Sequence, residues 1–376
     1  MADLSTTVNG LKMPNPFVIG SGPPGTNANV IGKAFDEGWG AVVAKTISLE
    51  AEKVVNVQPR YARLRSRESN EIFGWENIEL ISDRSFDVWM DEFKSIKDKY
   101  PDRILIASIM EEYRKDAWCE IVERCQDAGV DAFELNLSCP HGLPERKMGS
   151  AMGVNPDLVN EVTGWAMSVA KVPVWAKMTP NVTEIEDPTA AAMRAGADGI
   201  AAINTIRSVL GVDLKSLRPE PCVEGYTTPG GYSCQAIKPI ALRNCMEIAT
   251  LIRDEFPGKT LSGIGGIETG YDAAEFILLG SDCVQVCTGV MKRGYKMVKP
   301  MIEELSNFMD EHGFKSIDEF KGHSLQFFRT HAELVEIQAA ARLKKKAEHD
   351  AKQMIREDAQ WTGDDFVDQS DALSRG

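Results

Sequence analysis

Eight short runs of apolar, largely β-branched residues recur along the chain and constrain its fold more than any other feature. They are PFVIGS (16–21), GAVVAKT (40–46), ILIASI (104–109), DAFELNLS (131–138), PVWAKM (173–178), GIAAINT (199–205), TLSGIGG (260–266) and CVQVCTG (283–289). Near-continuous apolar runs are typical of parallel strands that are covered on both faces. Several connections, such as DAWCEIVERCQDAGV, have helical periodicity. Strand–helix alternation repeated eight times predicts an α/β fold, a (β/α)8 TIM barrel rather than an open doubly wound sheet.

The division of the chain follows from where the runs stop. We expect a barrel over residues 1–300 and a charged, helical C-terminal extension over 301–376, in which RLKKK (342–346) is a solvated helix face. Two connections, 47–103 and 206–259, are long. Connections of that length in a compact domain usually carry function.

Composition and charge exclude several classes of protein. The 376 residues include 42 Lys+Arg and 56 Asp+Glu, a net charge of −14, so neither nucleic acid nor an anionic membrane surface is an expected partner. The eight cysteines form no CxxC pair, which predicts reduced thiols, no iron–sulfur cluster and no metal site. The N-terminal segment resembles neither a secretory signal nor a transit peptide, and no apolar run would span a bilayer. We expect a cytoplasmic protein, or a plastid one if a transit peptide has been removed.

Polar residues stand where the predicted strands end. They are Ser21, Lys45, Thr46, Asn136, Ser138, Cys139, Lys177, Thr179, Asn204, Thr205, Gly265, Gly266, Thr288 and Gly289. In a TIM barrel these ends meet at one mouth, where the chemistry lies, and strands seven and eight commonly hold a phosphate. The pattern therefore predicts a site for a phosphorylated cofactor and a small, polar substrate.

Two glycine-rich segments differ in what they indicate. GSGPPG (20–25) matches GxGxxG, but Pro23 and Pro24 remove two of the N–H groups that a dinucleotide fingerprint needs, so a tight turn over the mouth is favoured. SGIGGIETG (262–270) precedes a helical run that begins near Tyr271, and its glycines let the backbone approach a phosphate closely.

Lys45 and Lys177 lie within apolar strands, where an unpaired ammonium is costly. One interpretation is a salt bridge at the end of the barrel. The other, which two such lysines favour, is a cation held against an anionic ligand such as a reduced flavin.

NLSCPHG (136–142) is the most specific segment. Asn136 and Ser138 alternate along a strand and so point the same way. Cys139 begins the next loop, where its thiol is either a general acid or a buried structural cysteine; its position favours the acid. The loop between Gly142 and Gly149 is a candidate lid, and His141 either tunes the thiol or caps the loop.

Further amide side chains lie in WENIELIS and at the end of the sixth strand. Asn77 and Asn204 each offer a donor and an acceptor, which suits an amide-rich ring. Taken singly, either residue is equally compatible with a turn or a helix cap.

The motifs together resemble the flavin-dependent dihydroorotate and dihydropyrimidine dehydrogenase family. The similar segments are NPFVIGSGPPGTN, AKTISLE, WENIELISD, NLSCPHGLPERKMG, WAKMTPNVT, AAINTI, RPEPCVEGYTTPGGYS, SGIGGIETGYDAAEFILLGS and VQVCTGVM. GHSLQFFRTHAELV and QWTGDDFV in the tail are similar to the plant-type dihydropyrimidine dehydrogenase branch, so the resemblance spans residues 4–376.

The resemblance implies an FMN-bearing barrel that reduces the 5,6 double bond of uracil or thymine with NADPH. Reduced FMN would give hydride to C6, and Cys139 would protonate C5 as the catalytic acid. The implied substrate-binding residues are Asn77, Glu79, Ile81, Asn136, Ser138, Asn204 and Thr205. The implied cofactor-binding residues are Ser21, Lys45, Thr46, Asn136, Lys177, Asn204, Gly231, Gly265, Gly266, Cys287 and Thr288.

Departures from the family pattern leave alternatives open. Long relatives carry iron–sulfur clusters, FAD and an NADPH domain that this chain lacks room for, so the FMN is reduced either by NADPH directly or by a reductase partner. Cys234 stands where many relatives have glycine. Oxidation of dihydroorotate and a non-catalytic FMN electron-transfer subunit are the competing functions. Family habit implies a homodimer.

Overall fold

The computed structural model describes residues 2–50, 55–140 and 147–352, with side chains up to residue 345. Its centre is a closed barrel of eight parallel strands in the order β10-β15-β16-β3-β4-β7-β8-β9. The strands are β3 Phe17–Ile19, β4 Ala41–Val43, β7 Ile104–Ile109, β8 Ala132–Asn136, β9 Val174–Lys177, β10 Gly199–Ala202, β15 Thr260–Ile264 and β16 Cys283–Val286. Each lies within one of the eight predicted runs, which confirms the TIM barrel.

The barrel strands are apolar on both faces because both faces are buried. In β7, Leu105 and Ala107 pack outward with the helices, whereas Ile104 and Ile106 belong to a separate cluster inside the barrel. The alternation follows the two-residue period of a strand. Both sets are buried, so the run reads as continuously apolar.

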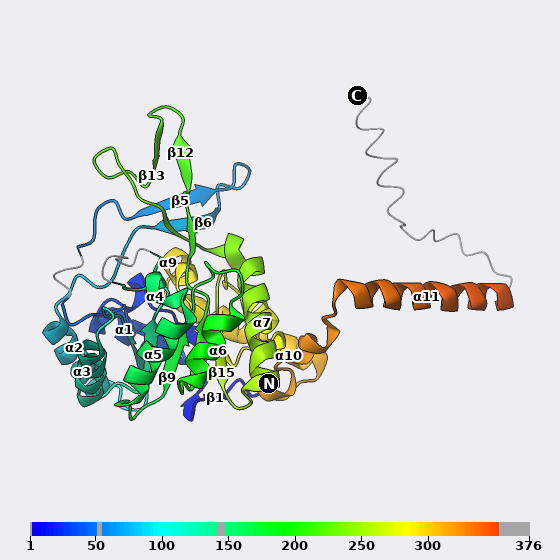
Figure 1. Cartoon of the computed structure of the whole chain (residues 1–376), viewed down its shortest axis with the longest axis horizontal. Coiled ribbons are helices and arrows are strands. Elements are labelled where there is room, and N and C mark those ends of the chain that lie inside the picture. Colours follow the sequence, from blue (N-terminus) through cyan, green and yellow to red (C-terminus); the bar gives the residue numbers. More distant parts are fainter. Residues whose placement is uncertain (1, 51–54, 141–146, 353–376) are drawn as a thin grey trace. The chain divides into compact units, whose positions relative to one another are not determined.

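Helices cover the outside of the barrel, as Figure 1 shows for α1, α2, α3, α5, α6 and α7. Their bounds are α1 Ala28–Glu37, α2 Phe86–Lys99, α3 Lys115–Asp127, α4 Ser150–Gly153, α5 Pro156–Met167, α6 Glu186–Arg194, α7 Lys238–Glu255, α8 Gly270–Leu278, α9 Thr288–Arg293 and α10 Val298–His312. The glycine-rich segment 262–270 leads into α8 as expected, and a capping box between Thr269 and Asp272 fixes its first turn. GSGPPG forms the tight 3-10 turn Pro23–Gly25, not a dinucleotide fingerprint.

A hairpin closes the N-terminal end of the barrel. Strands β1 (Thr6–Val8) and β2 (Leu11–Met13) are joined by Asn9 and Gly10, whose φ angles are +51° and +81°. Val8 and Met13 pack with Trp175 in the inner cluster. This end of the barrel is therefore filled, and the open end is the opposite one.

The two long connections pair with each other. Strands β5 (Tyr61–Arg65) and β6 (Ile72–Asn77) come from the first, and β11 (Ile206–Ser208) and β14 (Gly230–Ser233) from the second. They form one antiparallel sheet, β11-β14-β6-β5, with Gly231 opposite Asn77. A second hairpin, β12 (Gly211–Asp213) with β13 (Arg218–Glu220), lies at the same end of the barrel in Figure 1. The two long connections, which were predicted to carry function, thus contribute strands to one sheet.

The chain divides into two compact units, residues 1–326 and 327–376. The first contains α10, which packs on α8, so this unit continues past the expected boundary at residue 300. The second contains α11 (His331–Lys352), whose residues 341–345 are exposed as expected for a solvated face. The division into a barrel over 1–300 and an extension over 301–376 stays a prediction.

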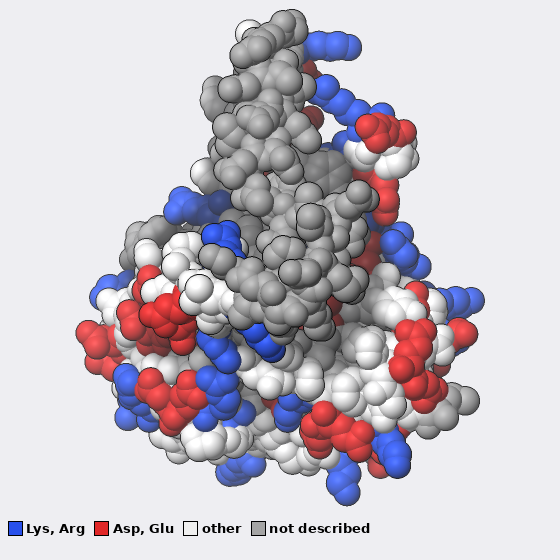
Figure 2. Space-filling view, turned by 90° about the vertical axis from the view of Figure 1, so that its right-hand side faces the viewer, with Lys and Arg blue, Asp and Glu red and all other residues white. Residues whose placement is uncertain are grey.

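Several composition-based expectations concern the described residues. The eight cysteines all lie in these ranges and none is in a disulfide, as expected for reduced thiols. Within the same ranges no helix is long and apolar enough to cross a bilayer, and no cluster of His, Cys, Asp and Glu could hold a metal ion. On the face shown in Figure 2, basic and acidic side chains are interspersed.

Candidate active site

The inward-facing positions of the barrel change from apolar to polar toward the C-terminal ends of the strands. On β8 the inner cluster residue Ala132 is followed two residues later by Glu134 and then by Asn136. On β9 Trp175 is followed by Lys177, and after β4 Val43 is followed by Lys45. Because the strands are parallel, these polar groups gather at one mouth.

A pocket of about 1080 Å³, including the part open to solvent, lies at this mouth. The strand ends and the sheet β11-β14-β6-β5 both line it. Fourteen predicted site residues are in its wall: Ser21, Lys45, Thr46, Asn77, Glu79, Asn136, Cys139, Lys177, Asn204, Thr205, Gly265, Gly266, Cys287 and Thr288. The volume is that of a site for a cofactor together with a small substrate.

Lys45 and Glu79 form a buried ion pair in the pocket wall. The Nζ–Oε2 distance is 2.6 Å, and Arg60 donates to the other carboxylate oxygen at 2.9 Å. Burial disfavours the charged carboxylate, but the charge and hydrogen bond of Lys45, with hydrogen bonds from Tyr61 and Arg60, outweigh it and lower the pKa of Glu79. The pair therefore holds a charged Lys45 at the mouth without leaving a net charge there.

Lys177 is held by a second carboxylate within the barrel. Its Nζ donates to Glu134 Oε1 at 3.0 Å, and Gln285 Nε2 donates to Glu134 Oε2 at 2.7 Å and to Ser262 Oγ at 3.2 Å. Gln285 lines the pocket, and its Oε1 is buried and has no hydrogen-bond partner in the described structure. The salt-bridge interpretation is thus confirmed for both lysines, and both residues also line the pocket.

Amides and hydroxyls form a connected network beside Lys177. Asn136 Nδ2 donates to Thr46 Oγ1 at 3.0 Å, and its Oδ1 accepts from Asn204 Nδ2 at 3.3 Å. Asn204 Nδ2 also donates to Ser138 Oγ at 2.8 Å. Thr205 donates its backbone N–H to Asn204 Oδ1 at 2.7 Å. These bonds fix the orientation of the amides before any ligand binds.

Cys139 follows this network at the edge of the pocket. The residue is 6% exposed, packs with Ile81, Met110 and Met148, and still lines the pocket wall. Its carbonyl accepts from the backbone N–H of Ser150 at 3.0 Å, which ties the far end of the following loop back to it. Cys139 therefore lines the same pocket as Asn77, Asn136 and Asn204. His141 and most of the predicted lid lie outside the described residues.

The opposite end of the pocket is made of backbone and small side chains. Gly265 and Gly266 have φ angles of +141° and +74°, and a Cβ on either would collide with Ala241 or Lys238. Thr288 Oγ1 donates to Ser233 Oγ at 3.3 Å. Cys234 also has a left-handed backbone, at φ +82°, which is the region that favours glycine.

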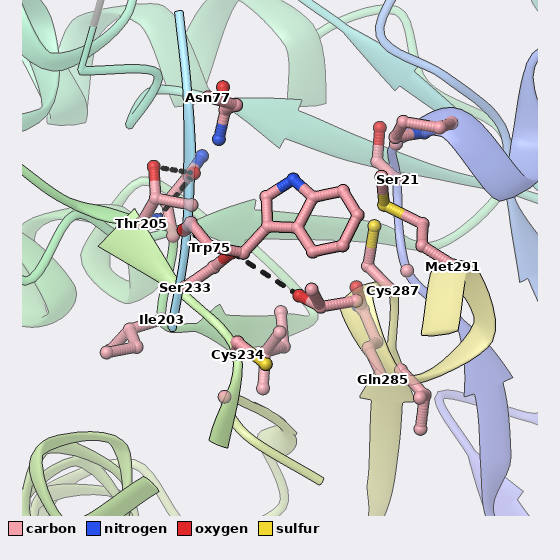
Figure 3. Close-up of a pocket in the computed structure, with 18 of the residues that line it drawn as sticks. Ser21, Trp75, Asn77, Ile203, Thr205, Ser233, Cys234, Gln285, Cys287 and Met291 are labelled. Carbon is pink, nitrogen blue, oxygen red and sulfur yellow. Dashed lines mark hydrogen bonds between the residues drawn. The ribbon is translucent and has the colours of Figure 1, made fainter. Parts of the chain in front are cut away.

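The sheet over the mouth contributes aromatic groups. In Figure 3 the indole of Trp75 lies between Asn77 and Thr205 on one side and Ser21 and Cys287 on the other. Trp75 is 4% exposed, yet its Nε1 has no hydrogen-bond partner in the described structure. A buried indole N–H usually has a partner, so this donor is available to a bound ligand.

Three predicted site residues are not in the pocket wall. Ile81 is fully buried against Cys139, Ser138 accepts from Asn204, and the Gly231 carbonyl accepts from Asn77 Nδ2 at 3.2 Å. A Cβ at Gly231 would collide with Thr205 Oγ1. They lie behind the wall and position the residues that form it.

Sequence reasoning missed several residues of the wall or its support, among them Glu134, Gln285, Tyr61 and Trp75. Glu134 and Gln285 are polar residues inside otherwise apolar strands, two positions before Asn136 and Cys287, and the two-residue period would have placed them on the same face. Tyr61 and Trp75 come from a segment without strong periodicity, and only its pairing with β14 brings them to the mouth.

Comparison with known proteins identifies the family. The family model described as dihydroorotate dehydrogenase matches residues 3–309. The chain belongs to the dihydroorotate dehydrogenase family. A crystal structure of dihydroorotate dehydrogenase in complex with ferulenol from Eimeria tenella has the same fold, with a TM-score of 0.70 over 86% of this chain and 88% of that one at 22% identity.

Curated relatives extend this similarity. The chloroplastic dihydropyrimidine dehydrogenase (NADP(+)) of Arabidopsis thaliana is 59% identical over 99% of this chain and 88% of its own length. A subunit of the NAD-dependent dihydropyrimidine dehydrogenase of Escherichia coli (strain K12) is 42% identical over 85% of this chain and 76% of its own. The catalytic subunit of dihydroorotate dehydrogenase B (NAD(+)) from Pyrococcus abyssi is 33% identical over 86% of this chain and 99% of its own length.

Proposed function

We propose that the chain is an FMN-dependent dehydrogenase that reduces the 5,6 double bond of uracil and thymine with NADPH, the first step of pyrimidine base breakdown. One observation carries the proposal: the amides of Asn77, Asn136 and Asn204 and the thiol of Cys139 line one pocket. A pyrimidine base presents alternating carbonyl and N–H groups, and each asparagine offers both complements. The A. thaliana relative, 59% identical, bears the name of this activity.

The pocket suits FMN, the cofactor that enzymes of this family use. Lys45 and Lys177 would contact the flavin, and the backbone of Gly265 and Gly266 with Thr288 would hold the phosphate. The unpartnered Oε1 of Gln285 supports this assignment, because it is a buried acceptor that none of the described residues satisfies. When bound, FMN supplies the hydride chemistry that no side chain can perform.

The side chains of the pocket would perform the remaining chemistry. Cys139 holds the proton that is added to C5 of the pyrimidine. Negative charge develops on the ring as C6 is reduced, and the N–H of Asn136 that does not bond to Thr46 stabilises this charge through a carbonyl oxygen. Because the Asn136 amide is already fixed by Thr46 and Asn204, little reorganisation is needed.

A carboxylate distinguishes the competing substrate, dihydroorotate, from a dihydropyrimidine base. A site for it needs a cation that is available to that carboxylate. Among the described wall residues the two ammonium groups, Lys45 and Lys177, are already paired with Glu79 and Glu134. This arrangement favours a neutral ring. A non-catalytic electron-transfer subunit would have no use for the thiol of Cys139.

Partners and location rest on the same relatives. We infer NADPH as the electron donor, either directly or through a reductase partner, a homodimer, and no iron–sulfur cluster in this chain. The A. thaliana relative is chloroplastic by name, which makes a plastid the proposed compartment ahead of the cytoplasm.

The proposal is tested by anaerobic spectroscopy of the purified protein. We expect a flavin spectrum that NADPH bleaches and uracil restores. A flavin that only dithionite bleaches, but that uracil restores, would assign reduction to a partner. A protein without flavin, or one reoxidised by orotate alone, would contradict the proposal.

A further inference from the structure

A second, basic groove lies directly behind the wall of the active-site pocket. It has a volume of about 620 Å³, including the part open to solvent. Strand β5, the β5–β6 turn and the end of α9 line it, and its charged residues are Arg63, Arg65, Glu71, Lys292 and Arg293. Trp75 and Met291 line both the groove and the pocket. The two cavities therefore share a wall.

The groove carries an excess of positive charge in an acidic protein. Lys292 Nζ lies 2.6 Å and Arg293 Nη2 lies 2.9 Å from the carboxylate oxygens of the buried Glu268. Arg293 is also 4.0 Å from Glu71. Four basic side chains thus line the groove, and within the described residues Glu71 and the buried Glu268 are the two carboxylates that pair with them, although the whole chain has a net charge of −14. An anionic ligand would neutralise the positive charge that these two carboxylates leave in the groove.

Arg63 and Arg65 are the two cations of the groove that form no ion pair with a carboxylate within the described residues. They alternate on β5 and are both exposed. Arg65 Nη1 donates to the carbonyl of Asn70 at 2.9 Å, which orients its guanidinium and leaves other N–H groups open. A planar, oriented guanidinium is the side chain best suited to binding a phosphate in two places.

The shared wall supplies an aromatic surface. The guanidinium of Arg63 stacks over the Trp75 ring, with Cζ 4.3 Å from the centroid. The Nε1 donor of the same ring has no partner in the described structure. A nucleotide combines a flat base with phosphates, so it matches a stacked arginine beside further arginines.

We propose that this groove binds the 2′-phosphorylated adenosine half of NADPH. The inference rests on the proposed function and places the entry of reducing equivalents on the β5–α9 side of the pocket. Arg65 and Arg63 hold the 2′-phosphate, and the rest of the dinucleotide passes over Trp75 and Met291 toward the pocket. The groove is concave and has the volume of a small-ligand site, whereas an acidic protein partner would need a larger contact surface.

The test compares Arg65→Glu and Arg65→Ala with Lys215→Glu in the holoenzyme. Lys215 is an exposed residue of the β12–β13 hairpin outside both cavities, so its substitution makes the same charge change elsewhere. We expect Arg65→Glu to raise the Kd of 2′,5′-ADP and the KM for NADPH by about ten- to a hundredfold, the range expected for a lost charge-assisted contact. Arg65→Ala should have a smaller effect, and the KM for NADH should change less than that for NADPH in both variants.

Three further results separate this inference from the proposed function. Equal 2′,5′-ADP affinity in Arg65→Glu and Lys215→Glu would overturn the site. Dependence on Arg65 that appears only with an added protein donor would also overturn it and assign the groove to an acidic protein. Reoxidation of dithionite-reduced protein by uracil needs no nucleotide. Its failure in the unsubstituted protein would therefore contradict the function, while the Arg65-dependent binding of 2′,5′-ADP would still support the site.

Discussion

Glu134 and Lys177 form an ion pair inside the barrel, with 3.0 Å between Oε1 and Nζ and side chains that are 1% and 7% exposed. Removal of one partner leaves the other charge buried and uncompensated, which typically costs about 3–5 kcal/mol. We therefore expect Glu134→Ala to lower the free energy of unfolding by about that amount in urea titrations.

A second substitution separates the cost of the pair from the cost of the cavity. The double variant Glu134→Ala, Lys177→Met should recover part of the loss, since no charge is then left unpaired. The exposed pair Arg194–Glu255, at 3.8 Å, is the control, and Arg194→Ala should cost less than about 1 kcal/mol. An additive double variant would show that the two charges do not stabilise each other.

Cys139 should be needed for turnover but not for flavin binding. We expect Cys139→Ala to retain the visible flavin spectrum and to lower kcat by about 10²–10⁴-fold, the contribution typical of a general acid. Reduction by NADPH should keep its rate, whereas reoxidation by uracil should slow. Cys287→Ala is a matched thiol substitution in the same pocket, and reoxidation by uracil that slows equally in both variants would remove the special role of Cys139.

Glu79 should give the protein a defined sensitivity to acid. Its pKa is lowered in the folded state, so its ion pair with Lys45 contributes stability above the ordinary carboxyl value of 4.5 and loses it as the pH falls through the folded value. The difference in unfolding free energy between the unsubstituted protein and Glu79→Gln should be largest at neutral pH. It should shrink below pH 4.5. A difference that is constant from pH 7 to 3 would contradict the lowered pKa.

Cys287 should react slowly with alkylating reagents despite lining the pocket. Burial raises the pKa of its thiol to about 11, against the opposing influence of Lys45 and Lys177. At pH 7.5 the thiolate is then present at roughly a thousandth or less of the thiol, and the thiolate is the nucleophile. Peptide mapping after brief treatment with iodoacetamide should find the half-buried Cys222 modified well before Cys287. Equal modification of the two cysteines would be inconsistent with the raised pKa.

The barrel could be predicted because each of its strands is buried on both faces, as Leu105 and Ile106 illustrate. The N-terminal hairpin was missed although Asn9-Gly10 is the dipeptide typical of its turn, since strands of three residues leave little periodicity to detect. The sheet over the mouth could not be predicted, because the pairing of β6 with β14 joins residues more than a hundred positions apart.

The site was predicted to the extent that it lies on strand ends. Lys45, Asn136 and Lys177 follow apolar runs and reach the mouth, as the geometry of a parallel barrel requires. Trp75 reaches the same pocket only through the tertiary pairing of its strand, which leaves no local signal. Ser138 lies on the expected face of its strand but is not part of the pocket wall, since its hydroxyl accepts a hydrogen bond from Asn204.

The pairing of Asn77 with Gly231 also limits how this mouth can change during evolution or engineering. The two connections that form the sheet are separate in sequence but share one set of backbone hydrogen bonds. A chimera that exchanges only residues 47–103 with those of a relative would therefore place foreign strand edges against the native β14. Substrate preference in such a protein depends on both connections together. Its transfer from a relative should therefore succeed only when both connections are exchanged.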